Sequence, residues 1–166
     1  MWHDIWTTLL GEFSDIPDVA TITRISLRMI LAVLLGGMLG YERERKARSA
    51  GLRTLMLVAL GASLFVFGPL QTGMEISDLS GVLQGLIQGI GFLGAGAIIV
   101  RRSQRTVQGL TTAASIWATS GVGTLVGLGF EATAALATVM LLIILAVIPI
   151  VAPSIEPDTS DQPPET

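Results

Sequence analysis

The chain has 166 residues, of which 51% are hydrophobic and 14% charged, with a formal net charge of −3 and a mean hydropathy of +0.68. It contains no cysteine, which excludes disulfides, thiolate metal sites and cysteine nucleophiles. Length and composition fit either one compact soluble domain or a small bundle of membrane helices, so the length of the apolar segments decides between them.

The first apolar pattern belongs to an amphipathic helix. Its apolar residues recur at helical spacing: Trp2, Ile5, Trp6, Leu9, Leu10 and Phe13. Asp4 stands where a signal peptide would be basic, and the apolar positions are not contiguous. Residues 1–20 therefore predict a helix lying in the membrane interface, followed by a turn. His3, the only histidine, is on the polar face, where it is either simply solvated or a proton sensor.

Five long apolar segments follow: Thr23–Tyr41, Leu52–Leu70, Gly81–Val100, Thr111–Gly127 and Ala132–Ala152. A membrane-crossing helix needs about 20 mostly apolar residues. These segments are apolar on all sides, whereas a helix of a soluble protein has a polar back. We therefore predict an all-α fold, with a five-span transmembrane bundle over residues 21–152 and a disordered acidic tail over residues 153–166.

The densest run of charge is YERERKARSAGLRT, between the first two apolar segments. Glu42 precedes Lys46 by four residues and Glu44 precedes Arg48 by four, which favours ion pairs on a helix. The first membrane helix is therefore predicted to continue to Arg48 and to end at a left-handed Gly51. A solvated helix end explains the charges equally well. We also expect an ion pair between Glu42 and Arg53, bracing the first two spans.

Arg28 lies inside the first apolar segment. It either extends its side chain outward to the membrane surface or is held by a partner inside the protein. Lysine keeps the charge but not the planar fork of donors, so Arg28→Lys is expected to impair function while Arg24→Lys is not.

The distribution of basic residues predicts the topology. Of ten Lys and Arg residues, five lie between the first two spans, three between the third and fourth, and two near the start of the first span. Basic loops face the cytoplasm. The N-terminus is therefore expected outside and the C-terminus in the cytoplasm.

Glycines recur four residues apart on two of the predicted spans, which permits close helix packing in lipid. The predicted packing positions are Gly36, Gly40, Gly81, Gly85, Gly89 and Gly94. The stripe from Gly81 to Gly89 is expected to meet either Gly36 and Gly40 or the same stripe in a second copy, and we favour a homo-oligomer. Gln84 and Gln88 beside it are expected to face protein or a water-filled cavity, through helix–helix hydrogen bonding or along a transport path.

The sequence predicts no catalytic residue, cofactor, metal site or nucleic-acid partner. No nucleophile-elbow, zinc-protease or P-loop motif occurs. The glycine pattern of Gly89–Gly96 is similar to a dinucleotide fingerprint but lacks a preceding strand. Acids such as Glu75 and Asp78 could ligate Mg²⁺ through oxygen, but scattered surface acids are more often solvated.

Two blocks, LLGGMLGYERERKARSAGLRTLMLVALGASLF and GIGFLGAGAII…VQGLTTAASIW, resemble the MgtC/SapB family of bacterial inner-membrane proteins over about Arg28–Glu131. The first family signature falls on Arg28, Gly36, Gly40, Glu42, Arg43, Glu44, Ala50, Gly51, Leu52, Arg53 and Thr54, and the second on Gly89, Gly91–Gly96, Gly109–Ala114 and Trp117. The resemblance implies a link to low-magnesium adaptation, virulence and restraint of the F-type ATP synthase. Many members carry a cytoplasmic domain after the fifth span, so a short member is expected.

We therefore expect a non-enzymatic regulatory protein that contacts lipids and partner membrane proteins such as ATP synthase. The alternative is a cation (magnesium) transporter or channel, suggested by polar groups within the bundle. The candidate functional residues are Arg28, Glu42, Arg43, Glu44, Arg53, Thr54, Gln84, Gln88, Thr111, Thr112 and Trp117. Trp117 is expected to pack either in the interior or at the membrane interface.

Overall fold

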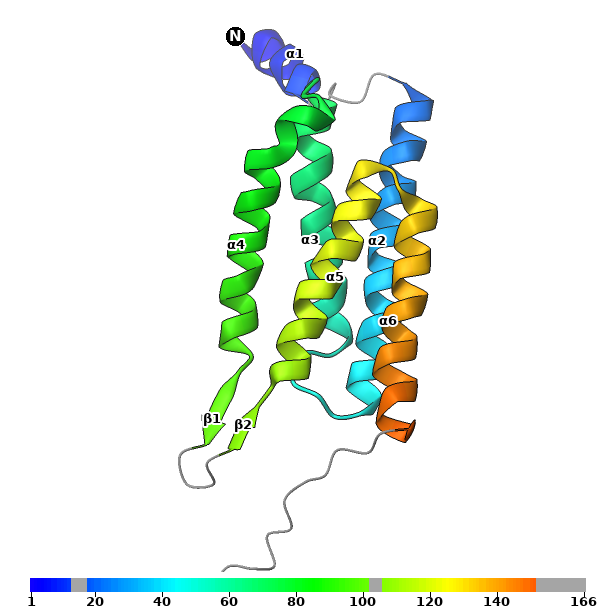
Figure 1. The fold of residues 1–166 in the computed structure, drawn as a ribbon. Helices are drawn as coiled ribbons and strands as arrows, with labels where there is room; N and C mark the ends of the chain where they lie inside the picture. The colour runs from blue at the N-terminus through cyan, green and yellow to red at the C-terminus, as the bar shows by residue number, and fades with distance from the viewer. Residues whose placement is uncertain (13–17, 102–105, 152–166) are drawn as a thin grey trace, which may run out of the picture.

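The computed structural model describes residues 1–12, 18–101 and 106–151. In chain order the elements are α1 (Trp2–Glu12), α2 (Val19–Arg45), α3 (Leu52–Gln71), the 3₁₀ turn η1 (Ile76–Leu79), α4 (Ser80–Gly96), β1 (Ile99–Arg101), β2 (Thr106–Gln108), α5 (Leu110–Leu128) and α6 (Glu131–Val151) (Figure 1). Helices dominate the described chain, as predicted, and the two strands form one short ribbon. The predicted tail at 153–166 lies outside the described residues.

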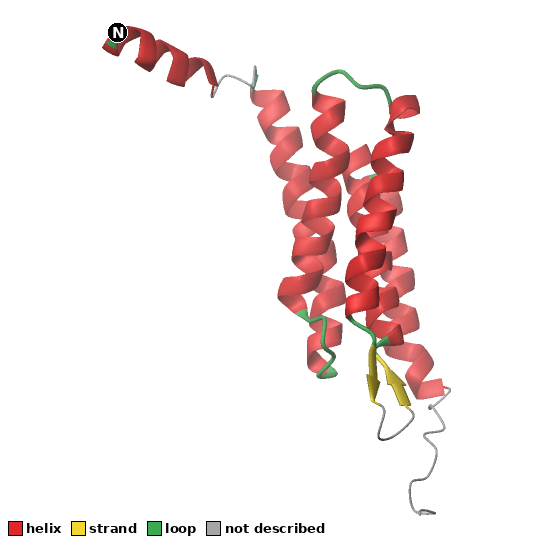
Figure 2. Ribbon diagram, turned by 90° about the vertical axis from the view of Figure 1, so that its left-hand side faces the viewer, coloured by secondary structure: helices red, strands yellow, loops and turns green. Residues whose placement is uncertain are grey.

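The helices α2 to α6 run side by side, each antiparallel to the one before it (Figures 1 and 2). The largest contacts join α3 to α2 and to α5, while α4 packs mainly on α5 and touches α3 less. The helix α1 lies beyond the end of the bundle where α2 begins, and it tilts away from the bundle axis (Figures 1 and 2).

Four helical stretches of the described chain are long and apolar enough to cross a membrane: Val19–Arg45, Leu52–Gln71, Ile76–Gly96 and Glu131–Ile148. The fourth predicted span, Thr111–Gly127, forms α5, a helix of 19 residues that is richer in serine, threonine and glycine. Much of α5 is buried against its neighbours, including Thr112, Ser115, Thr119 and Ser120. These four polar side chains are thus covered by protein.

The boundaries of α2 differ from the prediction at both ends. The helix begins at Val19 because the Asp18 side chain accepts a hydrogen bond of 2.6 Å from the Thr21 N–H, which caps the N-terminus. It ends at Arg45, and Ala47, with φ of 51°, takes the left-handed conformation that was wrongly predicted for Gly51. Gly51 is extended, at φ −98° and ψ −158°, and precedes α3. A Cβ on Gly51 would lie 2.8 Å from Glu44 Oε2, so the Glu44 side chain would have to move aside.

The predicted third span is too long at its C-terminus. The helix α4 ends at Gly96, and Ile99–Arg101 pairs with Thr106–Gln108 in an antiparallel ribbon. The β-branched residues of these strands favour the extended conformation. Gly109, at φ 93°, then lets the chain turn into α5 directly against the Ala97 carbonyl, where a Cβ would not fit.

Close backbone contacts hold α3 between α2 and α5. A Cβ on Gly36 would lie 2.6 Å from the Leu55 carbonyl oxygen, and one on Gly40 would lie 2.6 Å from Leu52 Cα. On the other side, a Cβ on Gly127 would lie 2.7 Å from the Ser63 carbonyl oxygen, and Gly123 lies directly against Ala59. Close approach of this kind is a main source of helix association in lipid.

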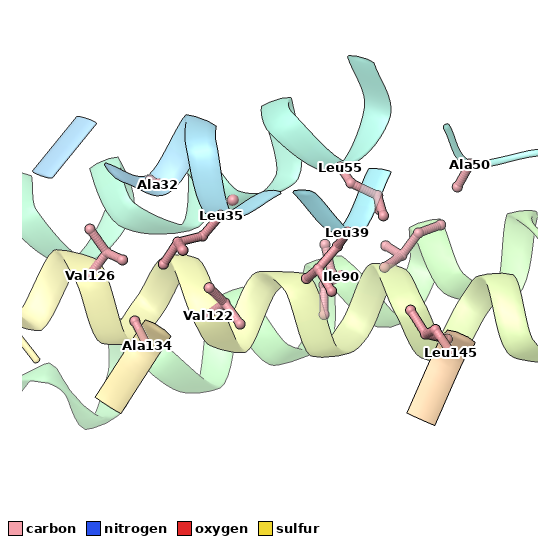
Figure 3. Close-up of a cluster of buried hydrophobic side chains, with 12 residues drawn as sticks. Ala32, Leu35, Leu39, Ala50, Leu55, Ile90, Val122, Val126, Ala134 and Leu145 are labelled. Carbon is pink, nitrogen blue, oxygen red and sulfur yellow. The ribbon is translucent and has the colours of Figure 1, made fainter. Parts of the chain in front are cut away.

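Apolar side chains fill the space between the closely packed helices. Leu35 and Leu39 of α2, Leu55 of α3, and Val122 and Val126 of α5 meet in one buried cluster (Figure 3). The α6 helix adds Ala134 and Leu145 to the same cluster. The core therefore joins α2, α3, α5 and α6, whereas α4 contributes only Ile90 and stands at the edge.

Candidate functional site

Arg28 forms the centre of a charged site at the end of the bundle where α2 begins. Its Nη1 donates a hydrogen bond of 3.1 Å to the Gly127 carbonyl, and its Nε lies 3.4 Å from Glu131 Oε1. The guanidinium also stands over the Phe67 ring, 5.6 Å from its centroid. One side chain from α2 thus contacts α3, α5 and α6. The side chain is 17% exposed, so the structure shows Arg28 held by protein partners.

The turn between α5 and α6 creates the partners of Arg28. The last carbonyls of a helix have no acceptor role within it, and they carry the negative end of the helix dipole. Gly129 ends α5 in the left-handed conformation at φ 87°, and Glu131 begins α6. A side chain on Gly129 would collide with the Arg28 guanidinium. Glu131 and Gly129 therefore belong to the site, although sequence analysis assigned no role to either.

A second charged site lies at the opposite end of the bundle. Glu42 Oε2 accepts a hydrogen bond of 2.5 Å from Arg43 Nε, and Glu42 Oε1 lies 2.6 Å from Lys46 Nζ. The predicted pair between Glu42 and Lys46 is thus confirmed. The Arg43 side chain is only 3% exposed, so its charge is compensated inside the protein.

Arg43 and Lys46 also bind α6 through the Leu145 carbonyl. Lys46 Nζ donates to this oxygen at 2.6 Å and Arg43 Nη2 at 3.4 Å. Pro149, four residues further on, has no N–H to donate, so the carbonyl loses its helical partner. The two cations replace that hydrogen bond and fasten the end of α2 to α6. The proline four residues after Leu145 was the sequence signal for this contact.

Two predicted ion pairs are not formed. Glu42 faces α6, where it lines a groove with Lys46 and Leu142, while Arg53 is exposed in the first turn of α3. The predicted pair between Glu42 and Arg53 is therefore wrong. Glu44 accepts a hydrogen bond of 2.8 Å from the Leu52 N–H, so it caps α3 in place of the expected pairing with Arg48.

The remaining predicted positions are spread over the bundle. Thr54 is exposed and lines a cavity of about 370 Å³ between α3, α4 and α5. Thr111 is exposed and Thr112 is buried. Trp117 is 57% exposed and lines an apolar groove of about 580 Å³ between α4, α5 and α6, so it does not pack in the interior. Gly94 is buried, and a Cβ added to it would lie 3.8 Å from the Cβ of Ala113.

The outer face of α4 differs most from the prediction. Gln84 and Gln88 are exposed and make no side-chain hydrogen bond with the described part of the chain, so the expected inward orientation is wrong for a single copy. A Cβ on Gly81, Gly85 or Gly89 would meet nothing within 4 Å, and the stripe does not pack on Gly36 and Gly40 of α2. Those two glycines face α3 instead.

Among residues 1–12, 18–101 and 106–151, no three histidine or acidic residues lie close enough to hold a metal ion together. The two charged sites hold helices to one another. Neither combines a nucleophile with a base.

A bundle of long apolar helices with its charges gathered at the two ends defines a polytopic α-helical membrane protein. The chain belongs to the MgtC family, whose model matches residues 29–153.

The relatives include Protein SrpB of Synechococcus elongatus, 46% identical over an alignment of 116 residues that covers 63% of this chain and 64% of the relative. Protein MgtC of Salmonella typhimurium is 43% identical over 116 residues, covering 70% of this chain and 48% of the relative. Protein MgtC of Brucella abortus is 45% identical over 118 residues, with the same coverage of 70% and 48%. The chain thus spans about half the length of the MgtC relatives. No solved structure matches it significantly.

Proposed function

We propose that this protein is a non-enzymatic regulator of the bacterial inner membrane that acts by contacting other membrane proteins. In this proposal α2 to α6 all cross the membrane, with the polar residues of α5 shielded by its neighbours, and α1 lies in the interface. The processes we propose are low-magnesium adaptation, virulence and restraint of the F-type ATP synthase, which the resemblance to the MgtC/SapB family implies.

The observation that carries the proposal is the open face of α4. Gln84 and Gln88 are four residues apart and share this face with Gly81 and Gly85. Uncovered amides are costly in lipid, and glutamine often bonds across helices there. The glycines leave room for a second backbone at the same place. A transmembrane helix of another subunit would cover both features, and we propose a second copy of this chain as the first such partner.

Cysteine crosslinking tests this proposal in the cysteine-free chain. Gly85→Cys is expected to give a disulfide-linked dimer in native membranes. Leu136→Cys is the matched control, because Leu136 is 62% exposed and lies as far from the start of α6 as Gly85 does from the start of α4. Gly85→Ile should lower the oligomer fraction, because the larger side chain holds the backbones apart.

Two results would overturn the proposal. A monomeric protein whose Gly85→Cys thiol reacts freely with a lipid-soluble reagent would show that lipid covers this face. Protein-dependent flux of Mg²⁺ or another cation into liposomes that contain only this chain would favour a transporter or channel instead.

A further inference from the structure

A pocket of about 480 Å³ opens between α2 and α3 at the end of the bundle where α2 begins. Its polar lining comes from Thr21, Arg24, Arg28 and Gln71, and its apolar lining includes Phe67 and Leu70. The pocket therefore combines positive charge and hydrogen-bond donors with an apolar wall.

The two arginines supply more donors than the protein uses. Arg24 and Arg28 are four residues apart, so they project from the same face of α2. Arg24 is exposed and forms no salt bridge within the described chain. The Asp18 carboxylate attracts Arg24 electrostatically without forming a salt bridge with it, and it accepts a hydrogen bond from the Thr21 N–H instead. Arg28 directs Nη1 to the Gly127 carbonyl and its buried Nε to Glu131, while its Nη2 makes no hydrogen bond to the described residues.

The position of the pocket along α2 suits a lipid headgroup. The 27 residues of α2 are roughly 40 Å long at about 1.5 Å per residue, which exceeds the hydrocarbon thickness of about 30 Å. Both helix ends therefore reach into the headgroup layers. Arg24, in the second turn, lies near the boundary between headgroups and hydrocarbon, where its side chain reaches the phosphates.

We propose that this pocket binds the phosphate of an anionic phospholipid, with Arg24 and Arg28 donating to its oxygens. The planar guanidinium suits bidentate phosphate binding. Gln71 and Thr21 add neutral donors, and an acyl chain lies along Phe67 and Leu70. A phospholipid is favoured over free phosphate because the apolar wall lies next to the polar end of the pocket, where an acyl chain can contact it. This proposal is independent of the function proposed above.

The test compares three probes on the full chain purified in a neutral detergent: phosphatidylglycerol, a diacylglycerol with the same acyl chains, and inorganic phosphate. Native mass spectrometry measures the lipid retained by the protein. Phosphatidylglycerol is expected to bind about tenfold more tightly than the diacylglycerol, since charge-assisted hydrogen bonds supply the difference. Inorganic phosphate at millimolar concentration should not displace it.

Arg24→Gln is the informative variant, because Arg28 also holds three other helices. It should lose most of the preference for phosphatidylglycerol while its unfolding temperature without lipid stays unchanged. Arg53→Gln, at an exposed position at the other end of the bundle, is the matched control and should keep the preference. Equal retention of the two lipids, or an unchanged preference in Arg24→Gln, would overturn the proposal. If inorganic phosphate displaces the lipid, the ligand of the pocket is free phosphate and the lipid proposal is wrong.

Discussion

Arg28 shows how much one side chain contributes when it reaches several helices. The planar guanidinium directs Nη1 to the Gly127 carbonyl and Nε toward Glu131 at the same time. A lysine places a single ammonium group at the end of a flexible stem and cannot reproduce both directions. The loss of these contacts in Arg28→Lys should therefore lower the stability of the protein as well as impair its function.

We expect Arg28→Lys to lower the free energy of unfolding by about 1.5–3 kcal/mol, the scale of one hydrogen bond to a charged group. Arg24→Lys should leave it unchanged, because Arg24 is exposed and forms no salt bridge within the described chain. Denaturant titration in detergent micelles, followed by circular dichroism, measures both values. Equal stability of the two variants would mean that the contacts of Arg28 add nothing.

Asp18 gives a pH-dependent cap to α2. The pKa of Asp18 lies below its ordinary value, mainly because the Thr21 N–H donates to the carboxylate. The capping contribution is therefore complete above the pKa of the unfolded chain, and it is lost as the pH falls through the lowered pKa of the folded protein.

Amide exchange at Thr21 is accordingly expected to become faster as the pH falls below about 4, after correction for intrinsic exchange. Asp18→Asn still caps a helix but does not titrate, so its corrected exchange should not vary with pH. NMR of the labelled protein in micelles gives both profiles. The same pH dependence in Asp18→Asn would assign the effect to another group.

At the scale of the element, α6 depends on α2 for one of its own hydrogen bonds. Pro149 leaves the Leu145 carbonyl without a helical donor, and Lys46 supplies a donor at 2.6 Å. Restoring the N–H with Pro149→Ala should return this carbonyl to the helix. The effect of removing Lys46 should then become smaller.

A double-mutant cycle measures this coupling. Lys46→Met is expected to cost about 1–2 kcal/mol of unfolding free energy when residue 149 is proline, and less when it is alanine. The cycle cancels the loss of the Glu42 pair, because this loss occurs in both backgrounds. Identical costs in the two backgrounds would show that Leu145 is not the relevant acceptor.

The seam between α3 and α5 depends on the absence of a side chain at Gly123. A Cβ there would strike the Ala59 carbonyl, which is backbone and cannot move without shifting α3. Gly123→Ala should therefore destabilise the protein by about 1–3 kcal/mol, as overpacking does in other cores. Gly121→Ala is the control on the same helix, since a Cβ there meets nothing within 4 Å. It should be neutral or slightly stabilising in the same unfolding measurement.

The sequence predicted where the helices lie along the chain better than it predicted which helices pack against each other. Apolar length placed α3 within one residue of its observed end, because a membrane helix needs a continuous apolar run. The same criterion extended α4 over Ile99 and Val100, since apolar residues are equally compatible with a strand. Helical spacing also grouped Gln84 with Gln88 correctly, but periodicity alone does not say which face of a helix meets the bundle.

Contacts between distant residues were the least predictable part of the sites. Arg28 and Glu131 are far apart in the chain, and their meeting depends on the order in which the helices pack. The same holds for Lys46 and the Leu145 carbonyl. A charged residue inside an apolar segment indicates that a partner is needed, but it does not identify that partner.

For the whole molecule, charge and topology agree in the described chain. The connection after α2 carries Lys46 and Arg48 and lies at the same end as the β1–β2 ribbon (Figure 1). The connection between α3 and α4 carries Glu75 and Asp78, and it lies at the opposite end with the turn before α6 (Figure 1). The positive-inside rule then predicts the first end in the cytoplasm and the second outside.

Single cysteines in the cysteine-free chain test this orientation, and with it the crossing by α5. Ser49→Cys, Ser77→Cys and Phe130→Cys all replace exposed residues in connections between helices. A membrane-impermeant maleimide should label Ser77→Cys and Phe130→Cys in spheroplasts, but Ser49→Cys only in inside-out vesicles. Phe130 is decisive because it follows α5, which is long enough to cross but is not among the four stretches that are also apolar enough. Labelling of Phe130→Cys on the same side as Ser49→Cys would show that α5 does not cross, and the five-span topology would be wrong.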